Sequence, residues 1–577
     1  MKCLVFSALV LLSTVAVFSQ QPVQPQPTPI RPGAVLPQDL PPVAPDFKAS
    51  ARPLPSMDRV GVEADRQMAL SLEDAIEFAL KNSNDIDASR SDVKIAEWNL
   101  RAARAAFDPV FEFQNLYEST ETPVASLIGG AVNGSVTQTR LFGSAGVAGS
   151  SPIFGGVYSA RFDSSRTTTS NTNSFLNPQF PSLLTFSYTQ PLFRGRGFDG
   201  NRRSIEIAKK NLSLSDSQFR QRAIEVISSV EQAYWDLTFA LRSLQVQIEA
   251  VKQARLQLES NRRQVEKGIL PPIDLVAAEA QIANFEQRVY LAQEVVTRAE
   301  NALKILILPD RTAADWSKAI VPVSPVNLDP PSPKLEDAVA EALRLRPEVT
   351  QLEAAKEIND IEKRYFRNRL KPQIDFTASY TAQGLAGTVT RNGQGRVPPT
   401  FIGGYLTSLG NVFGLNFPSY RFGVTVSLPF GNRAAEAEFG RVLVQESKIQ
   451  SQVAQTGQTI EAEVRNALQT LKSAEARLSA AAAERIAAEQ LFESEMRQFR
   501  VGTTTFYLVQ QRQTDLLNAR SRELQAQTDL NKAISGYHRA VGSTLEVNSV
   551  NVSSGGSILR LSSLRNSARV RFSPAKK

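Results

Sequence analysis

The feature that most constrains this chain is a long stretch without any helix-breaking residue. Between Asn201 and Lys267 there is neither proline nor glycine, which predicts a helix of about 66 residues, roughly 100 Å long at ~1.5 Å per residue. Gly268 and the pair Pro271-Pro272 then interrupt it, because glycine favours a helix end and proline fits the first turn of the next helix. A helix of this length exceeds an ordinary globular domain.

A second helix is predicted to run back from this turn as far as Leu308. Its apolar residues recur at alternating spacings of three and four, which is the pattern of a coiled-coil seam. These residues are Leu275, Ala278, Ile282, Phe285, Val289, Ala292, Val296, Ala299, Leu303 and Leu306. The stretch 201–308 therefore predicts one long helical hairpin.

The N-terminus is typical of a secretory signal peptide, which we assign to residues 1–19. Lys2 precedes an apolar run at 4–18, and the residues that end this run suit cleavage before Gln20. The chain's only cysteine, Cys3, would be removed with this segment. An exported chain without disulfides must be held by packing or assembly, which favours a bacterial periplasm or outer membrane.

The net charge of +8 comes largely from the C-terminal tail at 543–577. From Val547 onward, six of the 65 basic residues occur without any acid, which leaves 59 bases against 57 acids elsewhere. A nearly neutral body argues against a nucleic-acid partner, and we expect the tail to be solvated or loosely attached. No stretch beyond the signal peptide has the ~20 apolar residues of a transmembrane helix. Contact with a membrane would therefore have to use strands.

The rest of the chain divides into two similar repeats. Leu335-Glu336-Asp337-Ala338 restates Leu72-Glu73-Asp74-Ala75 at an offset of 263 residues, and Gly502 ends a second long helical stretch as Gly268 ends the first. The boundaries that we expect are a Pro-rich linker at 20–69, a first repeat at 70–308, a connector without regular structure at 309–334 and a second repeat at 335–542.

Each repeat offers two strands before its long helix. In the first repeat, Ser71 can cap an amphipathic helix that breaks near 82–85. The segment 120–182, rich in Gly, Ser, Thr and Asn, predicts a long surface loop with possible extra strand material at 137–147 and 157–166. The four strand candidates, which alternate aromatic and polar residues, are 110–119, 183–193, 373–380 and 420–430.

Four strands per chain have a physical consequence. A closed membrane barrel needs at least ~8 strands, and unpaired backbone groups are not tolerated in lipid. Helices of roughly 100 Å likewise have too few neighbours within one chain to cover their apolar faces. Several copies sharing one tube would meet both demands.

Together these features resemble the TolC family of outer-membrane efflux proteins, and the resemblance covers residues 70–542. The motifs that carry it, beside the two Leu-Glu-Asp-Ala openings, are Arg346-Pro347-Glu348-Val349, Gln190-Pro191-Leu192-Phe193-Arg194-Gly195 and Phe499-Arg500-Val501-Gly502-Thr503-Thr504-Thr505. The resemblance implies a mainly α protomer with membrane β. Its long helical hairpins would form a trimeric α-barrel, and four strands per chain would contribute to a shared 12-stranded β-barrel.

The resemblance also implies a function, which is a passive exit duct in the cell outer membrane with helices projecting into the periplasm. The implied partners are a homotrimer, a periplasmic adaptor (membrane fusion protein), an inner-membrane pump and outer-membrane lipid, with no cofactor. Drug efflux, metal efflux and type I protein secretion all fit this role. The competing interpretation is a periplasmic coiled-coil adaptor or scaffold that never enters the membrane, although adaptors usually carry one hairpin.

Enzymatic chemistry is disfavoured by the residues available. Gly195–Gly200 matches the G-x-G-x-x-G pattern of dinucleotide sites. That fingerprint requires a ~30-residue strand-helix-strand unit, whereas the helix here runs on to Lys267, so a flexible joint is the better interpretation. With His538 as the only histidine and Cys3 in the signal peptide, neither a metal cluster nor a Cys/His nucleophile can be assembled.

The two hairpin turns are the candidate functional sites, since the resemblance places them at periplasmic tips where the tunnel narrows and an adaptor binds. The candidate adaptor contacts are Gly268, Asp274, Gly502, Thr503 and Thr505, and the candidate aperture residues are Asp274, Phe499, Phe506, Leu508 and Gln511. Well-studied relatives close this aperture with a polar latch of carboxylates, an arginine and a tyrosine.

The second turn departs from that polar pattern. Asp274 matches one carboxylate of the latch, but Leu508 and Gln511 replace the other two. Thr504 replaces the arginine, and Phe499 stands at the tyrosine position. We hypothesise that closure relies on the apolar side chains of Phe499, Phe506 and Leu508. The alternative is that these side chains merely pack the hairpin.

Overall fold

The computed structural model of the chain describes residues 59–125, 127–131, 133–553 and 557–560. The predicted signal peptide at 1–19 and most of the predicted linker lie outside these residues. The described residues all belong to one compact unit by their internal contacts.

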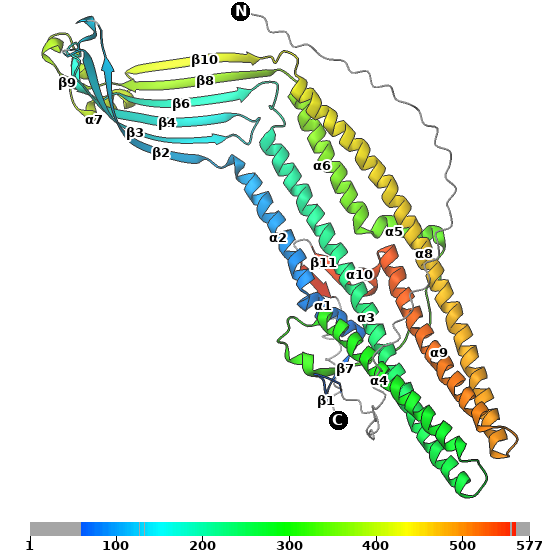
Figure 1. Ribbon diagram of the computed structural model, residues 1–577. Coiled ribbons are helices and arrows are strands. Elements are labelled where there is room, and N and C mark those ends of the chain that lie inside the picture. Colours follow the sequence, from blue (N-terminus) through cyan, green and yellow to red (C-terminus); the bar gives the residue numbers. More distant parts are fainter. Residues whose placement is uncertain (1–58, 126, 132, 554–556, 561–577) are drawn as a thin grey trace, which may run out of the picture. The chain divides into compact units, whose positions relative to one another are not determined.

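Helices make up most of the described residues, and the two longest are the long helical stretches that were expected to end near Gly268 and Gly502. The helices are α1 (Leu72–Asn82), α2 (Asn84–Arg104), α3 (Gly200–Glu266), α4 (Ile273–Ile307), α5 (Leu335–Leu345), α6 (Pro347–Arg369), α7 (Tyr405–Phe413), α8 (Arg433–Arg500), α9 (Phe506–Val541) and α10 (Thr544–Val547). Ser71 caps α1 as expected, because its hydroxyl oxygen accepts a hydrogen bond of 3.0 Å from the Asp74 backbone N–H. Figure 1 shows the two antiparallel pairs, α3 with α4 and α8 with α9.

The predicted coiled-coil seam forms the core of the first hairpin. Phe285, Val289, Val296 and Leu303 of α4 are each fully buried in one cluster with residues of α1 and α3. In the same cluster the hydroxyl of Tyr234 donates to the Leu70 carbonyl oxygen over 3.1 Å. The hydrophobic stripe therefore fixes the hairpin to the short helices that begin the repeat.

The main sheet is wider than predicted. Its strands, in spatial order, are β10 (Phe417–Ser427), β8 (Gln373–Gly384), β6 (Ser182–Pro191), β4 (Val157–Thr169), β3 (Ser135–Ser150) and β2 (Val110–Pro123), all antiparallel to their neighbours. Figure 1 shows these six strands side by side. Two short strands, β5 (Leu176–Gln179) and β9 (Gly387–Val389), pair beside them.

The expectation of four strands per chain is therefore wrong, and so is the long surface loop at 120–182. The extra strand material expected at 137–147 and 157–166 within that segment is confirmed by β3 and β4. The first repeat contributes β2, β3, β4 and β6 to the sheet, whereas the second contributes β8 and β10. β3 is rich in Gly, Ala and Ser, which have low strand propensity. Its stability comes from backbone pairing along its whole length with β2 and β4, so the local sequence pattern alone could not assign it to the sheet.

Two segments expected to lack regular structure also form strands. β1 (Glu63–Leu70), within the predicted linker, pairs in parallel with β7 (Lys318–Pro322), within the predicted connector. These strands are short, and each depends on a partner about 250 residues away in the chain. Their pairing is non-local, which explains why neither carries a clear period-two signal of its own.

The start of the C-terminal tail is packed rather than solvated, which corrects the expectation for 543–577. After α10, the strands β11 (Val550–Ser553) and β12 (Ser557–Arg560) form a two-stranded ribbon. Val550 and Val552 are buried in the same cluster as the first hairpin. Most of the basic residues of the tail lie outside the described residues. Among the described helices, none is both long and apolar enough to cross a membrane.

Candidate functional site

The two hairpin turns share one backbone geometry. Gly268 and Gly502 have φ of +71° and +77°, in the left-handed region that glycine adopts without strain. The N–H of each turn glycine donates to a carbonyl three residues back, over 2.9 and 3.0 Å. The next N–H, of Ile269 or Thr503, donates to a carbonyl five residues back over 2.9 and 3.0 Å. Both long helices therefore end in a Schellman motif.

The turns differ in how the return helix begins. At the first turn, Asp274 lies in the first turn of α4, and its N–H donates to the Pro271 carbonyl oxygen over 3.1 Å. At the second turn, the hydroxyl of Thr503 donates to the Gln498 carbonyl oxygen over 3.1 Å, and the hydroxyl of Thr504 donates to a carboxylate oxygen of Glu495. The second turn is thus tied back to α8 by two side-chain hydrogen bonds.

An apolar cluster joins the two tips. We call it the tip cluster, and its buried members are Ala278, Phe499, Phe506 and Val509, with Leu258, Leu270, Phe492 and Met496 packed around them. The rings of Phe499 and Phe506 are 5.8 Å apart between centroids. Because Ala278 comes from α4 and the two phenylalanines from the second hairpin, the cluster connects the hairpins of one chain.

Two hydrogen bonds flank the tip cluster. The side-chain amide of Gln510 donates to the Ala277 carbonyl oxygen over 3.2 Å. One turn of helix further along, the side-chain amide of Gln281 donates to the hydroxyl of Thr514 over 3.3 Å. Polar contacts therefore extend the apolar contact between α4 and α9, which holds both turns in a fixed relation within the chain.

The structure separates the predicted aperture residues into two groups. Phe499 and Phe506 are only 8% and 5% exposed, so within one chain they pack the tips together. Leu508 is 37% exposed and lies outside the cluster. Gln511 is exposed and Asp274 half-buried. Val509 and Ala278 were not among the candidates, although Ala278 belongs to the seam spacing that indicates a buried position.

The predicted adaptor contacts lie at the surface of the second tip. Gly502, Thr503 and Thr505 are exposed, as is Gly268 at the first tip. The structure places these residues on the two turns themselves, beyond the tip cluster. It thus brings the contact candidates together on adjacent tips, whereas the aperture candidates are divided between the cluster and the surface.

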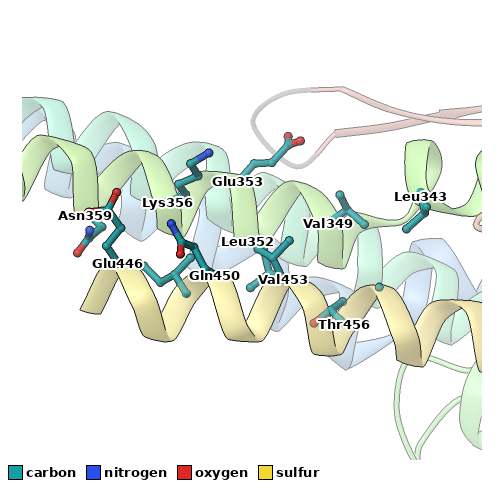
Figure 2. Close-up of a pocket in the computed structure, with 12 residues that line it drawn as sticks. Leu343, Val349, Leu352, Glu353, Lys356, Asn359, Glu446, Gln450, Val453 and Thr456 are labelled. Atoms are coloured by element: carbon teal, nitrogen blue, oxygen red, sulfur yellow. The ribbon is translucent and has the colours of Figure 1, made fainter. Parts of the chain in front are cut away.

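A groove that the sequence did not indicate lies between α6 and α8 and has a volume of about 360 Å³. Figure 2 shows Val349 and Leu352 on one side of this groove and Val453 on the other. Polar and charged side chains, among them Lys356 and Glu446, line its end. The groove leaves apolar surface of both helices open along the side of the chain.

The glycine-rich joint at 195–200 connects β6 to α3 without forming a phosphate cradle. Gly195 has φ of +83°, and its N–H donates to the side-chain oxygen of Asn368 over 2.9 Å. The carboxylate of Asp199 caps α3 by accepting from the Arg202 N–H over 2.8 Å. The guanidinium of Arg203 donates through Nε to Glu362 over 3.0 Å. The polar groups of the joint and of the first turn of α3 are thus satisfied by one another and by side chains of α6.

Comparisons with known proteins agree with this architecture. The sequence matches the family of outer membrane efflux proteins over residues 75–307 and 338–543. The two matched segments confirm the internal duplication. A sequence comparison with curated proteins finds no match.

Solved structures show the same fold at low sequence identity. The outer membrane channel CmeC of Campylobacter jejuni is 16% identical, with 82% of this chain and 86% of that chain covered and a TM-score of 0.57. VceC of Vibrio cholerae is 17% identical, with coverage of 82% and 96% and a TM-score of 0.55. The open state of MtrE from Neisseria gonorrhoeae is 16% identical, with coverage of 82% and 88% and a TM-score of 0.54. Because the family match extends over most of its length, this chain belongs to the outer membrane efflux protein family and is an outer-membrane channel.

Proposed function

We propose that three copies of this chain form one continuous exit duct, and that the duct receives its substrate from an inner-membrane pump through a periplasmic adaptor. Transport through such a duct is passive, and the pump supplies the driving force. Membership of the efflux family excludes the competing interpretation of an adaptor or scaffold outside the membrane. The number of copies and the two partners rest on the resemblance to the TolC family.

The observation that carries this proposal is a row of helices with open apolar sides. Within the chain, α2 packs on α3, α3 on α6 and α6 on α8. Trp98 and Ile95 of α2 are 64% and 56% exposed, and Val444 of α8 is 72% exposed. Different surfaces at the two ends of a row suit a head-to-tail interface, which closes into a ring when the rotation allows it.

Oligomeric state and partners provide the direct test. We expect native mass spectrometry of detergent-purified protein from outer membranes to give three chains per particle. We also expect a co-expressed periplasmic adaptor to co-purify with the wild-type protein. Co-purification should be lost when Thr503 and Thr505 on the exposed second tip are both replaced by arginine. A monomeric particle would contradict the proposal, and so would an adaptor that still co-purifies with the variant carrying both arginines.

We further propose that Leu508, Gln511 and Asp274 line the narrow end of the duct, while Phe499 and Phe506 act indirectly by fixing the tips. A carboxylate at position 508 would add mutual repulsion between copies at the constriction. Leu508→Asp should therefore increase the conductance of the purified protein in a planar bilayer. Tyr507→Asp is the matched control, because Tyr507 is the neighbouring residue and is 70% exposed. Unchanged conductance of Leu508→Asp would refute this aperture.

A further inference from the structure

The main sheet contains the hairpin of β3 and β4, which would not be needed if each chain gave only four strands to a shared barrel. This hairpin lies between β2 and β6 in the sheet. Its strands are 16 and 13 residues long, whereas a transmembrane strand needs ~9–11 residues. Both strands are therefore long enough to span a bilayer beside their neighbours.

Side chains on the two faces of the sheet differ in the way that a membrane wall requires. Residues directly paired across antiparallel strands point to the same face. One row of such pairs crosses all six strands and is apolar throughout, and it consists of Phe111, Val147, Ala160, Phe186, Tyr380 and Tyr420. Phe111, Phe186 and Tyr420 are 67%, 48% and 72% exposed. We call this side of the sheet the apolar face.

The adjacent row of pairs points to the opposite side, which we call the polar face. It consists of Glu112, Gly146, Arg161, Thr185, Thr381 and Ser419. Arg161 and Glu112 approach to 3.4 Å across Gly146, which has no side chain to separate them. The hydroxyls of Thr185 and Thr381 lie 3.2 Å apart. β3 and β4 thus follow the same division into faces as the other four strands.

The two edges of the sheet are complementary. β2 and β10 end the strand order, and within the described residues neither has a strand paired on its outer side. Since six antiparallel strands alternate in direction, β2 and β10 run oppositely. The outer edge of β10 can therefore pair in antiparallel fashion with β2 of a second copy, which satisfies the backbone groups that lipid would leave unpaired.

We propose that β3 and β4 are transmembrane strands of the barrel wall. Three copies would then close an eighteen-stranded barrel through β2–β10 pairing, rather than a twelve-stranded one. This inference rests on the trimer proposed above. Barrel diameter grows with strand number, and barrels of 16–18 strands enclose an aqueous channel. The inserted hairpin therefore widens the outer-membrane segment of the duct and leaves the number of helices unchanged.

Lipid contact of single cysteines provides the first test, since the chain's only other cysteine lies at position 3. Ala160→Cys on the apolar face of β4, labelled with a fluorophore, should be quenched by brominated phosphatidylcholine in vesicles. Ala378→Cys on the apolar face of β8 is the matched positive control, and Ser159→Cys on the opposite face of β4 should stay unquenched. Native mass spectrometry of each variant establishes its trimeric state.

The outcomes separate the two proposals. Quenching at positions 160 and 378 alike supports the wider barrel. Quenching at position 378 alone, in a trimeric protein, overturns the eighteen-stranded barrel but does not contradict the proposed trimeric duct. A protein that is not trimeric, or that is quenched at neither position, overturns both.

Oxidative crosslinking tests the pairing of edges. Gln114→Cys on the polar face of β2 is combined in turn with Ser419→Cys, Arg421→Cys and Thr425→Cys on the polar face of β10, which together sample several registers. At least one combination should yield covalent dimers and trimers on a denaturing gel. Phe113→Cys points to the other face and should yield none with the same three partners. Crosslinking that is absent from every Gln114→Cys combination overturns the β2–β10 junction.

Discussion

At the scale of single residues, the most constrained charges lie where the first hairpin meets the connector. Glu300 and Lys304 of α4 are each 1% exposed and 3.2 Å apart, and Arg59 also pairs with Glu300. One carboxylate oxygen of Glu300 accepts from the Ile320 N–H over 2.8 Å. The ammonium of Lys304 donates to the Trp316 carbonyl oxygen over 2.7 Å. Every charge in this group has a partner, as burial requires.

Removing the central carboxylate should cost far more than removing one cation. Glu300→Ala leaves Arg59 and Lys304 buried without an opposite charge, and we expect a loss of about 3–5 kcal/mol in the free energy of unfolding. Lys304→Met should cost less, because Arg59 still neutralises Glu300. Urea denaturation of the detergent-solubilised protein measures both. Equal losses for the two variants would contradict this account of the group.

Glu231 provides a pH-dependent prediction. Burial raises its pKa, although hydrogen bonds from Ser535 and Asn548 oppose that effect. A carboxyl with a raised pKa binds more protons in the folded than in the unfolded state, so stability falls as pH rises from the ordinary glutamate pKa through the raised one. Glu231→Gln should abolish this decline. Denaturation midpoints measured across that pH range would test it, and an unchanged slope would refute it.

The opposite sign is expected of the chain's histidine. Burial lowers the pKa of His538, whose Nδ1 lies 3.0 Å from the hydroxyl of Ser543. A histidine with a lowered pKa binds fewer protons when folded, so its contribution to stability is lost as pH falls below the ordinary value of about 6.5. His538→Gln should therefore reduce the loss of stability on acidification. A steeper loss of stability at acidic pH in this variant would be evidence against a buried, neutral His538.

Prediction at the residue scale succeeded where local patterns decide the outcome. The glycines at the turns and the cap at Ser71 follow from backbone chemistry that few other residues supply. The positions of Phe499 and Phe506 did not follow, because their burial depends on Ala278, more than 200 residues away in the chain. The sequence left aperture and packing roles open for both phenylalanines, and only the fold shows that they are buried within one chain.

At the scale of elements, the two Schellman turns should be sensitive to the loss of glycine. An alanine in the left-handed region is strained by roughly 1–2 kcal/mol, so Gly268→Ala and Gly502→Ala should each destabilise their hairpin by about that amount. Gly440→Ala is the matched control, because Gly440 lies inside α8 and a Cβ there would meet open space. Hydrogen exchange of the turn amides would report the difference. Equal protection in all three variants would show that the turns tolerate alanine.

The boundaries of helices and strands were predictable where nearby residues in the sequence determine them. The long helix predicted from Asn201 is observed from Gly200, because the absence of breakers and the apolar period specify it directly. Strands β2, β6, β8 and β10 were found from aromatic alternation. β3 has few large apolar side chains, and its pairing depends on register with its neighbours. Such a strand can be suspected from its sequence, but tertiary context is needed to place it in a sheet.

At the scale of the whole molecule, the proposed aperture makes the tip cluster the expected control on the width of the duct. Phe506→Ala removes a ring that is 5% exposed and lies between the two hairpins, and large-to-small core changes of this kind cost about 3–5 kcal/mol. Looser tips should raise the frequency of spontaneous opening in a planar bilayer. Tyr507→Ala, which alters an exposed neighbour, should leave that frequency unchanged. Equal opening frequencies in the two variants would show that opening does not depend on the tip cluster.

The general plan of the molecule was predictable, whereas its width was not. Duplication and long hairpins follow from the repeat offsets and from the long helical stretches. The six-stranded sheet does not follow, since the strand material at 137–147 and 157–166 cannot be assigned to the sheet until its pairing is known. The groove between α6 and α8 was missed for a similar reason, because it lies between helices that are separated by more than sixty residues in the chain.

The parallel pairing of β1 with β7 has a consequence for the order in which the exported chain can fold. Residues 63–70 must wait for residues 318–322 to leave the translocation machinery before their ladder can form. The intervening segment holds the whole first hairpin and four strands of the sheet. Closing so long a loop is slow unless its contents are already compact. We therefore expect the first repeat to fold before β1 and β7 pair, while the second repeat is still being exported.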